Sequence, residues 1–342
     1  MHDSLSGGSN GAISSFVVVP TVGPAAPRPP HRMSLLGLKN TVTRHNHPLS
    51  LHSLTDMVRS NCSNNSSSSK KGGGSSNVVH IIMCLEDDYP VAPVAMAIAR
   101  AFPLFSKKTK SSSGKKKATA KVISNAQTDA GDDDDNGGNT SIEAGEGARD
   151  DAGKGDGNDN ADVDDGKVIH VTFLDSHHKI IKNAIQIEAA KVAADGVRLA
   201  CRLVDTHPEE LTTTAYSTEV ATLFENEEAV TMEEIVGEEL KERGYGGIYN
   251  VGKGATEPPR LIILTYQPPP SLPMMEGTNY SSITLIGKGI VYDTGGLAIK
   301  SRAGMCGMKH DMGGSAGVLG GFWAAVQLRT PCKIRLLLCL VG

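Results

Sequence analysis

This sequence has few aromatic side chains, no long apolar run and only a small net charge. Aromatic residues make up 4% and apolar residues 39% of the 342 positions, and the second value is low for a globular protein. No apolar run approaches the roughly 20 residues that cross a bilayer, and the first residues lack the basic and apolar regions of a signal peptide. We therefore expect no membrane segment and no secretory signal.

A strong basic field is also missing. The formal net charge is −4, so nothing draws the chain as a whole to nucleic acid. Seven lysines do gather in residues 107–121. Fourteen acidic residues follow in 129–165, however, and the lysine-rich stretch holds no aromatic residue that could stack on a base. Nucleic-acid binding is therefore disfavoured.

Cysteines are few and scattered. No two of the six have the Cys-x-x-Cys spacing of a zinc or redox site, and a chain of this length seldom depends on a disulfide framework. We expect reduced thiols in a cytoplasmic protein. The six are Cys62, Cys84, Cys201, Cys306, Cys332 and Cys339.

Two segments have the composition of disordered chain. Residues 1–76 are rich in Ser, Asn, Gly, Pro and His, and residues 107–166 join the lysine block to the acidic block. Residues 156–160 resemble the start of a calcium loop, but Ala161 stands where that loop needs Gly and Lys167 where it needs Glu. We predict a disordered N-terminal segment and a solvated insertion.

The remaining sequence predicts an α/β fold in two domains. An N-terminal α/β domain covers 77–187, interrupted at 107–166, and a second α/β domain with a mainly parallel central sheet covers 188–342. Residues 283–341 read as strand, loop, helix, strand, which is a βαβ unit. The expected strands are 78–85, 168–174, 261–265, 283–286 and 333–341, and the expected helices are 91–102, 188–204, 233–243 and 315–328.

Charged residues and glycines gather inside this βαβ unit. Lys288 and Asp293 lie in a Gly-rich turn after a strand, and Lys300 and Asp311 follow before a Gly-Gly pair and a helix. Hard divalent ions favour carboxylates, and two such ions can share a carboxylate and activate a water. A lysine beside two dications can lose its proton and bind metal, while a protonated lysine can stabilise an oxyanion.

The charged residues and glycines of the βαβ unit could also have only a structural role. Asp and Lys are common surface residues after strands, and residues 252–254 repeat the Gly-Lys-Gly triplet without a following Asp-x-Gly-Gly. We interpret that earlier triplet as structural. A phosphate-binding loop is excluded, because GxxxxGK[ST] occurs nowhere in the chain.

The motifs resemble those of a known family. Residues 286–296 (IGKGIVYDTGG), 299–300 (IK) and 308–314 (MKHDMGG) are similar to the active-site region of the leucyl (cytosol) aminopeptidases, with spacings of five, seven and eleven between the four charged positions. Residues 195–206 and 241–249 resemble the probable aminopeptidase-like branch of that family. The resemblance covers about 188–342, and it is weaker over 78–105 and 168–187.

The resemblance implies a role for each residue. Lys288 would bind the tighter metal through a neutral amine, Asp293 would bridge both metals and Asp311 would bind the tighter one. Lys300 would polarise the substrate carbonyl, and Met308 would line the pocket for the N-terminal side chain of the substrate. The family uses two Zn²⁺ or Mn²⁺ ions, acts on peptides with a free N-terminus, and forms cytoplasmic hexamers.

One departure from the family pattern bears on activity. An Asn-Thr-Asp-Ala-Glu-Gly-Arg segment, whose Asp and Glu complete both metal sites in the family, does not occur in these 342 residues. We therefore expect a truncated catalytic domain, weak binding of two metals, little hydrolysis, and an unprotected edge strand at 336–341. The alternative is a non-catalytic family scaffold with a regulatory or assembly role.

Overall fold

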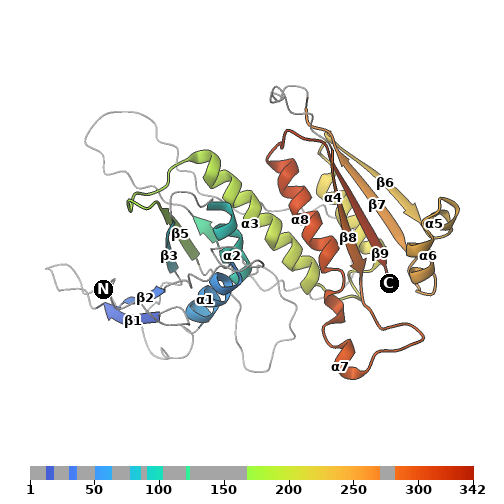
Figure 1. Ribbon diagram of the computed structural model, residues 1–342, viewed down its shortest axis with the longest axis horizontal. Coiled ribbons are helices and arrows are strands. Elements are labelled where there is room, and N and C mark those ends of the chain that lie inside the picture. Colours follow the sequence, from blue (N-terminus) through green and yellow to red (C-terminus); the bar gives the residue numbers. More distant parts are fainter. Residues whose placement is uncertain are drawn as a thin grey trace, which may run out of the picture.

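The structure, a computed structural model, describes eight parts of the chain, and Figure 1 shows their arrangement. The parts are residues 13–18, 31–36, 51–63, 78–85, 91–102, 121–123, 168–269 and 282–342. They form three sheets: a two-stranded hairpin and two larger sheets with helices packed on them. One long helix, α3 (Ala184–Asp205), lies between the two larger sheets. The α/β class predicted from the sequence is confirmed.

The N-terminal unit is a three-stranded parallel sheet under two helices. Its strands run in the order β3 (Val78–Cys84), β5 (Val168–Leu174) and β4 (Lys121–Ile123). The core lies between this sheet and the helices α1 (Leu51–Ser63) and α2 (Val91–Ala101). Alternate residues of β5 face that core, as expected of a strand covered on one face: Ile169, Val171 and Phe173 are buried.

Four elements fall where the sequence predicted disorder. A short hairpin pairs β1 (Ile13–Val18) with β2 (His31–Leu36), and α1 packs on α2. The hydroxyl of Thr55 in α1 donates to the carbonyl oxygen of Ala97, 2.9 Å away. Strand β4 lies within the predicted insertion. The rest of 1–76 and 107–166, including the rejected calcium loop, lies outside the described residues.

Helix α3 contributes to both cores. Asn183 begins it, because its side-chain oxygen accepts hydrogen bonds from the backbone N–H groups of Ile185 and Gln186. Ala190 belongs to the N-terminal core, whereas Leu203 belongs to the core of the second unit. The predicted domain boundary at residue 188 therefore lies inside one continuous helix.

A close contact between backbones explains the glycine in the middle of α3. Gly196 lies against Gly320 of α8 (Gly313–Gln327), and a Cβ added to Gly196 would stand 2.6 Å from the carbonyl oxygen of Gly320. A Cβ on Gly320 would come within 2.3 Å of the carbonyl oxygen of Gly196. A glycine inside a helix normally weakens it, but here the residue lets two helices touch.

The second unit contains a four-stranded mixed sheet. Its strands run in the order β6 (Val230–Val236), β7 (Arg260–Tyr266), β9 (Ile334–Val341) and β8 (Ile283–Ile290). Buried residues of α3, α4 (Thr213–Phe224) and α8 join one face of this sheet in a single core. On the other face, Leu240 of α5 (Glu238–Glu242) shares a smaller core with Ile235 and Leu261, against which residues of α6 (Gly246–Gly252) pack.

Two predictions about this sheet are wrong. Only β8 and β9 are parallel, and both β6–β7 and β7–β9 are antiparallel. The connections between the strands explain these directions. The short helices α5 and α6 keep the chain near the end of the sheet where β6 stops, so β7 runs antiparallel to β6. The longer helix α8 returns the chain along the sheet, so β9 runs parallel to β8. The predicted helix at 233–243 is strand β6, a Gly237 turn and the short α5.

The unprotected edge strand expected at 336–341 is a third wrong prediction. Strand β9 is central, because it pairs with β7 on one side and β8 on the other. Its residues Leu336, Leu338 and Leu340 are fully buried. The described edge strands are β6 and β8.

Two further findings concern the residues that the structure describes. Every helix in the described parts is too short or too polar to cross a lipid bilayer. The six cysteines are all free thiols.

Candidate functional site

The charged motif lies where β8 ends and α8 begins. Gly287 and Lys288 stand near the end of β8, and α8 passes close beneath them. A Cβ on Gly287 would lie 2.5 Å from the Cα of Ser315, and a Cβ on Gly314 would lie 3.3 Å from the backbone N and O of Lys288. The glycines in the motif therefore bring the start of α8 against the strand that carries Lys288.

Asp293 and Lys300 form one ion pair in the loop after β8. The Lys300 Nζ lies 2.7 Å from the Asp293 Oδ2, and the Asp293 Oδ1 accepts a hydrogen bond from the backbone N–H of Gly295. Gly295 has a φ of 88°, a conformation that favours glycine. The Lys300 ammonium also donates to the Sδ of Met308, at 3.3 Å. This ion pair ties residue 293 to residue 300 and so holds together the two ends of the loop between them.

Lys288 and Asp311 form the second ion pair. The Lys288 Nζ lies 2.9 Å from the Asp311 Oδ1. Asp311 follows the short 3-10 helix η3 (Met308–His310), and its side chain is only 19% exposed, against 58% for that of Lys288. The second oxygen, Oδ2, is buried and has no hydrogen-bond partner. A buried carboxylate oxygen without a partner is costly unless something else binds it.

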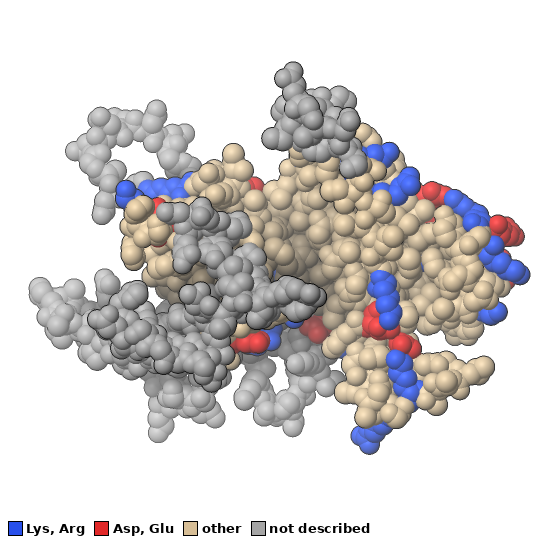
Figure 2. Space-filling model, in the orientation of Figure 1, with Lys and Arg blue, Asp and Glu red and all other residues tan. Residues whose placement is uncertain are grey.

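The two ion pairs act on each other. The Lys300 ammonium beside Asp293 holds the pKa of that carboxyl below its usual range, the Gly295 N–H adds to the effect, and the charge of Lys288 lowers the pKa further. Asp293 therefore stays ionised at neutral pH. Figure 2 shows basic and acidic side chains together on this face, between the sheet and the loop that carries α7 (Arg302–Met305).

A buried polar pair lies directly beneath the motif. Ser315 and Tyr216 are both fully buried, and their hydroxyl oxygens are 3.1 Å apart. The Ser315 hydroxyl also lies 2.7 Å from the carbonyl oxygen of Met312, the residue after Asp311. Burial raises the pKa of Tyr216, so its hydroxyl stays protonated. The sequence analysis missed this pair, although a serine at a buried position of an apolar helix was a usable signal.

The structure brings all the predicted site residues into one neighbourhood. Four are joined in the two ion pairs, and Met308 contacts Lys300 through its sulfur. Among the described residues, no three His, Cys, Asp or Glu side chains gather in an arrangement that could hold a metal ion. Any metal held here would therefore need a lysine amine beside the two carboxylates.

Comparison with known proteins agrees with the motif. The model of the cytosol aminopeptidase family, catalytic domain, matches residues 198–342, and the model of the M17 aminopeptidase N-terminal domain 2 matches residues 30–111. Together the two matches cover about two thirds of the chain. The chain belongs to the leucyl (cytosol) aminopeptidase family. The members of this family are metal-dependent peptidases.

Curated relatives of this chain include mammalian and nematode proteins. The probable aminopeptidase NPEPL1 of Mus musculus is 31% identical over 307 residues, which are 90% of this chain and 45% of the relative. Leucine aminopeptidase 1 of Caenorhabditis elegans is 41% identical over 148 residues, which are 43% of this chain and 28% of the relative. The chain spans less than half the length of these relatives.

Solved structures support the same fold. An M17 aminopeptidase from Trypanosoma brucei matches with a TM-score of 0.64 and 29% identity, over 97% of this chain and 51% of that one. The leucine aminopeptidase LAP1 of Caenorhabditis elegans matches with a TM-score of 0.59 and 27% identity, over 90% of this chain and 48% of that one. Both likenesses take in the N-terminal unit as well as the sheet that carries the ion pairs.

Proposed function

We propose that this chain is a metal-dependent aminopeptidase that releases N-terminal residues from peptides. The observation that supports it is the pair of lysine–carboxylate contacts where β8 meets α8, within the segment that the catalytic-domain model of the family matches. A salt bridge by itself would satisfy both partners. Here the buried Oδ2 of Asp311 remains without one.

The donor set fits divalent cations. The two carboxylates suit Mn²⁺, and zinc accepts oxygen and nitrogen donors. Asp311 and the Lys288 amine would hold one ion, and Asp293 would be shared with a second. Lys288 would have to bind as a neutral amine, which a neighbouring dication favours because it destabilises the ammonium form. We propose Mn²⁺ or Zn²⁺ at this site.

The chemistry divides between the ions and the chain. Bound divalent ions would polarise the scissile carbonyl and lower the pKa of an attacking water. Lys300 would keep its proton, because its partner Asp293 is held ionised, and would stabilise negative charge on the carbonyl oxygen as the water adds. Met308 lies against Lys300 and would contact the side chain of the N-terminal residue.

The number of donors limits what these residues do alone. Two carboxylates and one amine are few ligands for two ions, since each ion takes four or more. We infer that the 342-residue chain binds a second ion more weakly than the first and turns over leucyl substrates slowly. The same count favours the alternative, a family scaffold with a regulatory or assembly role.

Calorimetry tests the metal site. Titrating Mn²⁺ or Zn²⁺ into the 342-residue protein should give one ion bound more tightly than any other. Asp311→Asn should weaken the binding of that ion by more than about tenfold, because even the loss of a hydrogen-bond partner of a metal ligand costs that much. Asp205→Asn is the matched control, because Asp205 pairs with Lys309 and belongs to neither of the two ion pairs. Equal affinity in Asp311→Asn would refute the site, and two tight ions would refute the argument from donor number.

Hydrolysis of leucine p-nitroanilide tests the reaction. With Mn²⁺ present we expect slow turnover that Lys300→Met abolishes, since the oxyanion would lose its cation. Lys333→Met, an exposed lysine just before β9, should leave turnover unchanged. Turnover that survives Lys300→Met would remove Lys300 from the mechanism. No turnover by folded, metal-loaded protein would favour the scaffold role.

Cytoplasmic location and a hexamer are proposed from the resemblance alone. Several curated relatives carry the name probable cytosol aminopeptidase. Light scattering of the purified protein, and imaging of a tagged copy in cells, would test the two proposals separately.

A further inference from the structure

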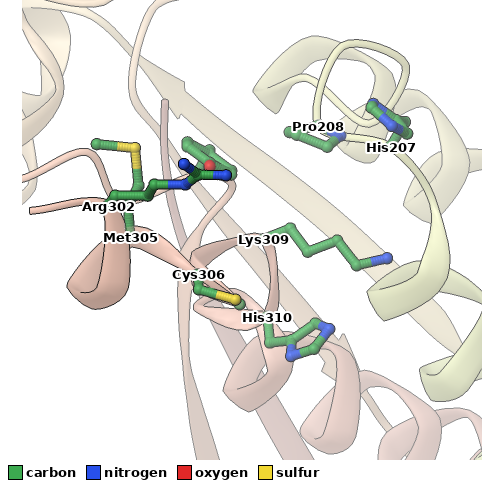
Figure 3. Close-up of a pocket in the computed structure, with 9 residues that line it drawn as sticks. His207, Pro208, Arg302, Met305, Cys306, Lys309 and His310 are labelled. Carbon is green, nitrogen blue, oxygen red and sulfur yellow. The ribbon is translucent and has the colours of Figure 1, made fainter.

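A cavity of about 430 Å³ is lined in part by Tyr292, Lys309 and His310, which are sequence neighbours of the ion-pair residues. Figure 3 shows this cavity. It opens between the turn that follows α3 and the segment that contains α7 and η3. Figure 3 shows Arg302 and Met305 on one side and His207 and Pro208 on the other, with Lys309, Cys306 and His310 between them. Nine residues line it: His207, Pro208, Tyr292, Arg302, Met305, Cys306, Gly307, Lys309 and His310.

The charge of this cavity is one-sided. Its lining includes Arg302, Lys309 and two histidines, but no Asp or Glu. Lys309 is partly neutralised, because its Nζ lies 3.7 Å from the Asp205 Oδ1 and donates to the Asp205 carbonyl oxygen at 3.3 Å. Within the described parts of the chain, the guanidinium of Arg302 forms no ion pair and no hydrogen bond. An unpaired guanidinium offers a planar fork that matches a carboxylate.

The cavity also has an apolar part, and two of its lining residues are next in sequence to predicted site residues. Pro208, Met305 and the Tyr292 ring can contact the backbone or methylene groups of a peptide. Tyr292 immediately precedes Asp293, and Lys309 immediately follows Met308. A peptide whose N-terminal residue lies at Met308 could therefore place a later residue in the cavity.

A metal is a poorer occupant than an anion. Cys306, His207 and His310 are possible ligands, but no three His, Cys, Asp or Glu of the described chain are grouped for an ion. We propose that this cavity binds a carboxylate of the peptide, carried beyond the bond that is cut. The carboxylate can be the C-terminus of a short peptide or an Asp or Glu side chain. The inference rests on the proposed function, because it assumes that a peptide occupies the site.

Methionine-methyl NMR of the metal-free protein tests binding without hydrolysis. The Met305 methyl group, assigned through Met305→Leu, reports on the cavity, and that of Met232 on β6 reports on a distant surface. Leu-Gly-Gly is compared with Leu-Gly-Gly-amide, and Leu-Gly-Asp-amide with Leu-Gly-Asn-amide. The first pair isolates a C-terminal carboxylate and the second a side-chain carboxylate.

We expect at least one acidic peptide to shift Met305, but not Met232, with an affinity about fivefold above that of its neutral partner. Arg302→Gln should remove this preference, and Arg302→Lys should retain part of it, because a lysine keeps the charge but loses the fork. Arg335→Gln, an exposed arginine on β9, is the matched control and should change nothing. Arg302 is exposed, so its replacement should not unfold the chain.

Two results would overturn the proposal. One is equal affinity for the acidic and neutral peptides of both pairs. The other is a preference for acidic peptides that Arg302→Gln leaves intact. Failure of the peptidase proposal would look different: no metal bound and no hydrolysis, with the Met305 shifts unaffected.

Discussion

The two sheets on either side of α3 differ in what lies inside them. The N-terminal core is aliphatic and aromatic apart from Thr55, and its strands are all parallel. The second unit buries Thr213, Ser217 and the Tyr216–Ser315 pair, and its edge strand β8 contains two buried glycines. Polar burial is therefore concentrated in the unit that carries the ion pairs.

This difference shows that the second unit contains features that lower its stability. A buried hydroxyl stabilises little even when it is paired, and it destabilises when it is not. Glycines weaken a strand, because they have no side chain to pack. The buried hydroxyls and the glycines of β8 both lie close to Lys288 and Asp311, where they set the distance between β8 and α8. In the N-terminal unit, where nothing comparable has to be positioned, ordinary apolar packing suffices.

The strongest test of this comparison is the backbone contact between α3 and α8. Gly320→Leu should lower the free energy of unfolding by about 3 kcal/mol, because the new side chain has no room next to Gly196. Urea unfolding followed by circular dichroism measures the change. Gly317→Ala, on the same helix but facing open space, should instead stabilise by about 0.5–1 kcal/mol. Similar values for both variants would show that the helices are not in close contact.

The buried hydroxyl pair gives the next largest effect. Ser315→Ala should cost about 2 kcal/mol, because it leaves the Tyr216 hydroxyl buried without a partner, whereas Tyr216→Phe should cost about 1 kcal/mol, since Ser315 keeps the Met312 carbonyl. The double variant should cost less than the sum of the two. Denaturant melts give all three values.

A counterpart in the N-terminal unit sharpens this test. Thr55→Val should cost about 1 kcal/mol, because the Ala97 carbonyl loses its donor. It should leave Mn²⁺ affinity unchanged, while Ser315→Ala should reduce it. If Thr55→Val weakened the metal as much as Ser315→Ala does, the contrast between the two units would be lost.

The smallest effect concerns pH and lies in the N-terminal unit. His80 and His170 stack across β3 and β5 with ring centroids 4.7 Å apart. Burial, and then the neighbouring His80, lower the pKa of His170. The unfolded chain therefore binds the proton more readily, so the stability that this effect contributes is present above about pH 6.5 and is lost as the pH falls through the lower folded pKa.

Substitution of either histidine checks this pH dependence. His170→Gln should flatten the decline of stability between neutral and mildly acidic pH, and His80→Gln should flatten it in part. Thermal melts across that pH range measure the decline. An unchanged decline in His170→Gln would mean that another group causes it.

The sequence predicted the βαβ unit and its motif, because both are local. Glycines, two apolar runs and four charged residues lie within one stretch, and the structure joins the charged residues in pairs. The prediction from sequence failed at β6, because Glu233 and Glu234 are residues that favour a helix. Arg260 on β7 binds Glu234 at 2.8 Å, and pairing with β7 makes the segment a strand. Such pairing depends on residues far away in the chain.

The remaining errors have the same origin. Helix α1 has a narrow apolar stripe, in which Leu54 and Val58 are buried only because α2 covers them. Ser315 in an apolar helix indicates a buried hydroxyl, but its partner Tyr216 lies 99 positions away, so no local pattern identifies the contact. Arg302 and His207 likewise meet around a cavity that only the folded chain creates.

Sharing α3 between two cores has a practical result for dissecting this protein. A polypeptide that began at residue 198, where the catalytic family model starts, would lose the Asn183 cap and the Gly196 contact with α8. Its remaining helix would be too short to hold its shape unaided. The two units should then melt in a single transition in the intact chain, and the second would have to be excised upstream of Asn183 to survive alone.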